Sequence, residues 1–211
     1  MFVPQAQQVA VTPALELSVP MIIIASVVVV SVLAWIIKPL KYAFIMSPYL
    51  VVHRFHVHRL LTAGWLHADA SHLLFNLLTL YFFGDQVVKA LGPERFILLY
   101  VTAVVIAHVP TTIRHRNNPK YSSLGASGAV AAVIFSAILL TPGLKLSLLF
   151  LPIPIPGYAY AFGYLAYSAW SSYRARDGIN HDAHFAGAIY GSLLTYALEP
   201  TRVARTISTF F

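Results

Sequence analysis

The chain has 211 residues, of which 58% are hydrophobic and only 10% are Asp, Glu, Lys or Arg, and its mean hydropathy is +0.72. Soluble domains carry about 25% charged residues, so this composition excludes an ordinary soluble domain and a disordered chain. The absence of cysteine excludes disulfides, zinc–thiolate sites and cysteine nucleophiles. The net charge of +7 comes from basic residues in short connections between apolar segments. This placement favours anionic lipid headgroups, and not nucleic acid, as their partner.

Apolar segments of membrane-spanning length follow one another along the chain. We expect a short N-terminal tail over 1–17, one all-α membrane domain of six helices over 18–198, and a C-terminal tail over 199–211. Apolar stretches of about 20 residues predict membrane-spanning helices. The expected spans cover residues 18–37, 71–91, 93–109, 123–140, 157–173 and 183–198.

Two connections are too apolar to be free loops. Residues 38–65 are rich in aromatic residues, Arg and His, a composition typical of segments that lie in the membrane interface. Residues 151–157 read LPIPIPG, and the alternating prolines exclude a continuous helix there. We therefore expect an extended return to the membrane before the fifth span.

The order of the spans predicts that three distant segments meet. Because successive helices cross in alternate directions, the second, fourth and sixth helices all begin on the same membrane face. The polar residues near those three starts are His72 with Asn76, Ser127, and His184. We therefore expect these side chains to share one depth in a protein-lined, watery pocket.

Ser127 lies in the sequence Gly125-Ala126-Ser127-Gly128. A serine between glycines at a helix start can bring its hydroxyl and backbone N–H groups close to a bound carbonyl. The alternative is a face of small residues that packs against another helix. The α/β-hydrolase motif G-x-S-x-G does not fit, because residue 129 is alanine.

His184 begins the sixth span, where an ionisable side chain is costly and is therefore a functional candidate. We expect it to act as general base toward Ser127 as nucleophile. The alternative is a histidine that bonds a backbone carbonyl. Gly187 and Gly191 on the same helix form G-x-x-x-G, a spacing that permits the close helix approach a Ser–His hydrogen bond requires.

His72 and Asn76 are four residues apart and project from one helix face. Such a donor pair suits an oxyanion, and the alternative is an interhelical hydrogen-bonded pair. No third triad member stands out, because Asp182 points away from His184 on its helix and Asp69 precedes the second span. The sequence therefore predicts a Ser–His dyad.

Together these residues resemble the rhomboid intramembrane serine proteases. The resemblance covers roughly residues 58–198 and rests on HRLLTAGWLHADASHLLFN, GASGA and AHFAGAIYG. These segments meet the family pattern H-x-x-x-N, G-x-S-G and A-H-x-x-G-x-x-x-G in its order. The resemblance implies a serine endopeptidase that cleaves transmembrane segments of membrane-protein substrates and needs no cofactor.

The resemblance also assigns roles to single residues. It implies Ser127 as nucleophile, His184 as general base, and His72, Asn76 and the Ser127 backbone N–H as the oxyanion hole. It makes residues 38–65 the family's partly embedded first loop, with Arg59 and His67 as structural anchors.

One position departs from the family pattern. Many members carry an aromatic residue four positions after the serine, where this chain has Ala131. Either another aromatic residue such as Tyr190 or Tyr164 supports His184, or the imidazole is held less firmly. Two alternatives therefore stay open: a non-catalytic relative that binds membrane helices, and a small transporter or channel that uses the polar residues as a pathway.

The other histidines have no expected function. The H-x-x-H-x-H stretch from His53 to His58 lacks acidic companions, so we expect no metal site there. His108, His115 and His181 fall at span ends or in loops, and we expect surface positions for them.

The orientation of the chain is argued from its basic residues. On the side of the second, fourth and sixth helix starts lie Lys38, Lys41, Arg54, Arg59, Arg114, Arg116, Lys120, Arg174 and Arg176. On the other side lie Lys89, Arg95, Lys145, Arg202 and Arg205. The positive-inside rule would turn the catalytic face inward, although the count becomes equal without the first loop. Following the resemblance, we expect a multi-pass protein of a bacterial cytoplasmic membrane with its catalytic face outward.

Overall fold

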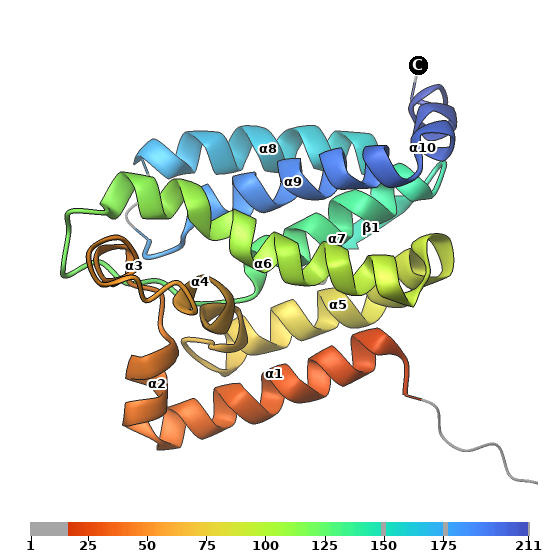
Figure 1. Cartoon of the computed structure of the whole chain (residues 1–211). Helices are drawn as coiled ribbons and strands as arrows, with labels where there is room; N and C mark the ends of the chain where they lie inside the picture. The colour runs from red at the N-terminus through yellow and green to blue at the C-terminus, as the bar shows by residue number, and fades with distance from the viewer. Residues whose placement is uncertain (1–16, 149–150, 175–176, 211) are drawn as a thin grey trace, which may run out of the picture.

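The computed structural model describes residues 17–148, 151–174 and 177–210, so the expected N-terminal tail lies outside it except for Leu17. In this part of the chain, the helices of 14 residues or more are α1 (Val19–Ile36), α5 (Ala70–Leu91), α6 (Pro93–His115), α7 (Ser127–Leu140), α8 (Gly157–Arg174) and α9 (His181–Leu198) (Figure 1). By length and hydropathy, α1 and α6 are the two of these that could cross a membrane. The expected count of six spans therefore stays a prediction.

Helix α7 forms the centre of the bundle. Of its 14 residues, 12 are buried. Helices α5, α6 and α9 pack around it, while α1 packs on α5 and α8 packs on α9 (Figure 1). A helix that is apolar on every side suits this central position.

Glycines allow α7 and α9 to lie in backbone contact. A Cβ atom on Gly187 would overlap the carbonyl oxygen of Gly128, and one on Gly191 would lie 2.5 Å from Cα of Ala132. The small residues of the G-x-x-x-G spacing therefore bring together the two helices that carry Ser127 and His184.

The start of the fourth expected span is wrong by four residues. Helix α7 begins at Ser127 and not at residue 123, because the backbone N–H and C=O of Ser123 pair with those of Met46. Gly125 then has a φ of +120°, which lies outside the helical region.

Two other helices are longer than predicted. Helix α6 continues through Pro110 to His115, beyond the expected end at residue 109. Helix α9 begins at His181 instead of 183, because the side-chain oxygen of Asn180 accepts the Ala183 backbone N–H as an N-cap.

Short helices follow α1 over 38–65, the segment that is expected to lie partly in the membrane interface. They are α2 (Lys38–Phe44), α3 (Pro48–Arg54), α4 (Arg59–Thr62) and the 3₁₀ helix η1 (Ala63–Trp65). They gather at one end of the bundle beside α1 and α6 (Figure 1).

The structure is mostly helical, in agreement with the all-α prediction, and it adds a short pair of strands after α7 and a further helix after α9. Strands β1 (Lys145–Leu148) and β2 (Leu151–Pro156) form an antiparallel hairpin, with Leu146 opposite Ile155. The segment with alternating prolines is thus extended, as predicted, but paired. Within the expected tail over 199–211, α10 (Pro200–Ile207) buries Val203 and packs on α7 and α9.

Candidate active site

Ser127 and His184 meet at the starts of their helices. Ser127 is the first residue of α7 and His184 lies in the first turn of α9. The distance between Ser127 Oγ and His184 Nε2 is 2.7 Å. Both residues are half-buried. With Nε2 unprotonated, the serine hydroxyl donates to the imidazole, which is the arrangement general-base activation requires.

Aromatic rings surround the imidazole of His184. The Tyr164 ring of α8 lies nearly parallel to it, with centroids 6.3 Å apart, and the His181 ring meets it edge-on at 5.8 Å. Tyr190 points elsewhere and donates its hydroxyl to Thr102 Oγ1. Tyr164 and Ala131 belong to one apolar cluster, so the aromatic ring beside His184 comes from α8 and not from α7.

Among the described residues, neither candidate carboxylate bonds His184. Asp182 pairs with Arg114 at 2.9 Å and accepts the Ser172 hydroxyl. Asp69 caps α5 by accepting the Ser71 hydroxyl and the His72 backbone N–H, and these two hydrogen bonds hold the pKa of Asp69 below its usual value. The geometry is therefore that of a dyad.

His72 and Asn76 both lie on α5, one helical turn apart. Asn76 is 7% exposed, and its buried Nδ2 has no hydrogen-bond partner among the described residues. The ring of His72 lies against Gly125, where a Cβ would be 2.9 Å from His72 Nε2 and 3.8 Å from Ser127 Oγ. Gly125 therefore allows close approach of the His72 ring in the loop before α7, and it does not belong to the helix-packing face that was the alternative for these small residues.

His67 links α1 to the start of α5. Ser31 donates its hydroxyl to the Trp65 carbonyl, so the 2.9 Å contact between Ser31 Oγ and His67 Nδ1 is a bond donated by His67. The His67 carbonyl accepts from Trp35 Nε1, and its ring meets the His72 ring edge-on at 4.9 Å. Burial, followed by the neighbouring His72, lowers the pKa of His67 to about 3.

Arg59 holds the segment before α4. Its Nη1 donates to the carbonyls of Tyr42 and Ile45 at 2.8 and 2.6 Å, and its Nε donates to His56 Nδ1. The remaining histidines of that stretch have separate partners, since His53 contacts Asn117 and His58 contacts a backbone carbonyl.

A polar cavity of about 360 Å³ is lined by His181, whose ring contacts that of His184, while neither Ser127 nor His184 is among the described residues that line it. Its walls come from the end of α6, the end of α8 and the start of α9, and include Ser123, Ser171, Asn180 and His181. His181 is 4% exposed and bonds Asp177 at 3.1 Å through Nε2. The expected surface position of His181 is therefore wrong. The spacing of four residues between Asp177 and His181 was the one feature of the sequence that could have indicated their pairing.

His108 is likewise buried and not at the surface, and its Nδ1 donates to the Val104 carbonyl. Here the continuation of α6 through Pro110 places it inside the bundle.

Comparison with known proteins finds one matching family model and relatives named after the same family. The rhomboid domain family model matches residues 54–201. The mitochondrial presenilin-associated rhomboid-like protein of Mus musculus is 28% identical over 151 residues, which cover 66% of this chain and 38% of the relative. The mitochondrial RHOMBOID-like protein 12 of Arabidopsis thaliana is 31% identical over 113 residues, covering 46% of this chain and 34% of the relative.

A bacterial relative also matches. YdcA of Bacillus subtilis (strain 168), named as a candidate rhomboid protease, is 36% identical over 72 residues, covering 34% of this chain and 35% of the relative. The chain thus spans little more than a third of the length of these relatives.

Proposed function

This chain belongs to the rhomboid family, and we propose that it is an intramembrane serine endopeptidase that cleaves transmembrane segments of other membrane proteins. Membership makes it an integral membrane protein. The observation that carries the proposal is the 2.7 Å contact between Ser127 Oγ and His184 Nε2, made by residues 57 positions apart in the sequence.

The proposed reaction uses Ser127 as nucleophile. Its Oγ attacks the scissile carbonyl carbon while its proton passes to His184 Nε2. His184 then gives this proton to the leaving amine, and the acyl group stays on Ser127. A water molecule, deprotonated by His184, attacks the acyl carbonyl. His184 then returns this proton to Ser127 Oγ as the bond between Oγ and the acyl carbon breaks, which releases the second product. We expect this water to come from the polar cavity that His181 lines.

The proposed oxyanion hole comprises His72, the Asn76 side chain and the Ser127 backbone N–H. The unpartnered Nδ2 of Asn76 supports this role, since a buried donor without a partner is costly unless a ligand accepts from it. One such donor contributes about 3–4 kcal/mol to transition-state stabilisation.

The substrate must expose a peptide bond that a helix normally shields. We therefore expect cleavage where Gly, Pro or other helix-weakening residues let the substrate unwind near the start of α7. The relatives include mitochondrial and bacterial proteins, so the bacterial cytoplasmic membrane and the outward catalytic face stay predictions.

The test is cleavage by the purified protein in lipid vesicles. We expect a model transmembrane substrate to be cut, and a serine-reactive phosphonate to label Ser127. Ser127→Ala should abolish both signals, and Ser208→Ala, at an exposed serine after α10, should keep both. Cleavage that survives Ser127→Ala would exclude Ser127 as the nucleophile and overturn the proposal. A folded protein that neither cleaves the substrate nor takes the label at Ser127 would overturn it in favour of a non-catalytic helix-binding protein.

A further inference from the structure

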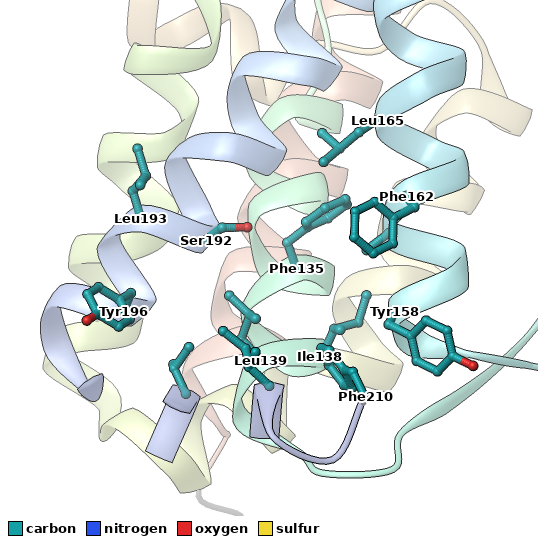
Figure 2. Close-up of a pocket in the computed structure, with 13 residues that line it drawn as sticks. Phe135, Ile138, Leu139, Tyr158, Phe162, Leu165, Ser192, Leu193, Tyr196 and Phe210 are labelled. Carbon is teal, nitrogen blue, oxygen red and sulfur yellow. The ribbon is translucent and has the colours of Figure 1, made fainter. Parts of the chain in front are cut away.

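An apolar cavity of about 360 Å³ lies at the end of the bundle away from Ser127 (Figure 2). It opens between α7, α8, α9 and α10. Its walls include Phe135, Ile138, Phe162, Leu193, Ile207 and Phe210. Phe162 and Leu193 are 67% and 64% exposed, so the cavity is open on the outer surface of the bundle.

The cavity suits a hydrocarbon chain. The hydroxyl of Ser192, one of its few polar groups, donates to the Ala188 carbonyl and offers little to a polar ligand. A helix is about 10–12 Å across with its side chains, which exceeds what this volume can hold, whereas a single acyl chain is much narrower. On the outer surface of a membrane protein, lipid chains are the ligands at highest concentration.

A cation is fixed at one edge of the cavity. Arg202 precedes Val203, which lines the cavity, and its Nε donates to the Leu140 carbonyl at 2.8 Å. This bond holds the guanidinium beside the last turn of α7, where Leu139 lines the cavity. Arg202 is exposed and has no carboxylate partner among the described residues. Its Nη groups are therefore available to a phosphate.

We propose that this cavity binds one acyl chain of an anionic glycerophospholipid, with the lipid phosphate on Arg202. Helix α10 and the residues directly after it form one wall, because Val203, Ile207 and Phe210 all line the cavity. Arg202 then lies at the level of the headgroups, as basic residues do in other amphipathic interfacial helices. The inference depends on membrane embedding and not on the proposed proteolysis.

The test is native mass spectrometry of the detergent-solubilised full chain with phosphatidylglycerol and phosphatidylcholine of the same acyl chains. We expect the wild type to retain phosphatidylglycerol at least fivefold more than phosphatidylcholine. Ala161→Phe, which fills the cavity from α8, should abolish retention of both lipids, and Ser192→Leu should do so from α9. Arg202→Gln should remove the preference for phosphatidylglycerol.

Two matched variants are expected to behave as the wild type. Ala166→Phe adds the same ring to an exposed position of α8 outside the cavity, and Arg205→Gln removes a charge from another position of α10. Retention without headgroup preference, or an equal loss in Ala166→Phe, would overturn the proposal. So would a dimer or a bound transmembrane peptide that Ala161→Phe displaces, because the cavity would then belong to a second copy or to a substrate helix.

Discussion

The imidazole of His184 is oriented by rings and not by an acid. In a serine–histidine–aspartate site, a carboxylate accepts from the second ring nitrogen and fixes the tautomer. Here the face of Tyr164 and the edge of His181 border the ring, and Asp182 pairs with Arg114. Packing therefore restricts the rotation of the imidazole. This arrangement avoids placing a charged carboxylate inside the membrane beside His184.

Asn76 offers a residue-scale test that separates catalysis from stability. Its Nδ2 makes no hydrogen bond among the described residues, so Asn76→Ala breaks none in the resting protein. We expect kcat to fall about 10²–10³-fold, as for loss of an oxyanion donor, while the free energy of unfolding changes by less than about 1 kcal/mol. Cleavage assays in vesicles and denaturation in mixed detergent micelles measure the two quantities.

The matched control for this substitution is Asn117→Ala, which removes an exposed amide before α7 and should leave kcat unchanged. An Asn76→Ala enzyme that cleaves within twofold of the wild type would exclude Asn76 from the oxyanion hole.

At the scale of elements, the distance between α7 and α9 controls the dyad. Gly187→Ala would push a methyl group into the Gly128 carbonyl, so the helices must separate and lengthen the contact between Ser127 and His184. We expect cleavage to fall more than tenfold and stability to fall by about 1–3 kcal/mol, the range for overpacked cores. Cleavage assays and denaturation of the same preparation measure both effects.

Gly163→Ala is the control for this packing argument, since a Cβ at Gly163 on α8 meets nothing within 4 Å. It should keep full activity and unfold no more easily than the wild type, because alanine favours a helix over glycine. Equal losses in the two variants would contradict the packing argument.

His67 makes the junction of α1 and α5 sensitive to acid. Its pKa is about 3 in the folded protein against 6.5 ordinarily, so below pH 6.5 the unfolded chain binds a proton that the folded chain does not. The free energy of unfolding should therefore fall as pH falls from 6.5, by about 1 kcal/mol per unit from this residue. In His67→Asn the pH dependence should be shallower by that amount, as denaturation at pH 7 and 5.5 would measure. An unchanged slope would contradict this assignment.

The sequence predicted the helical cores better than their ends. Hydropathy located α5 and α7 because long apolar runs are encoded locally. The start of α7 at Ser127 depends on the pairing of Ser123 with Met46, a contact across 77 positions that no local pattern contains. Helix α10 was not predicted, because its few apolar residues become buried only through packing on α7 and α9.

In the candidate site, too, the sequence predicted what local patterns encode and missed what tertiary contacts determine. Helix parity predicts that Ser127 and His184 lie at one depth, and in the structure the two side chains are in contact. The identity of the ring beside His184, Tyr164, required knowledge of how α8 packs on α9.

At the scale of the whole molecule, the basic residues on the catalytic side are not all free charges. Arg59 donates to the carbonyls of Tyr42 and Ile45, and Arg114 pairs with Asp182. Charges that are bound within a folded segment are weak topology signals compared with free residues in short loops. On the other side, Arg95 pairs with Glu199 and Arg202 donates to the Leu140 carbonyl. Bound charges therefore weaken the topology signal of both sides, and the outward orientation stays a prediction.

Orientation can be measured directly because the chain has no cysteine. Ser122→Cys and Ser208→Cys each introduce one thiol at an exposed serine, the first before α7 and the second after α10. A membrane-impermeant maleimide should label Ser122→Cys in intact bacterial cells. It should label Ser208→Cys only after the cells have been permeabilised. The wild type, labelled in neither condition, is the control. The reverse pattern would mean that the unbound basic residues near the catalytic face determine topology, and that cleavage takes place on the cytoplasmic side.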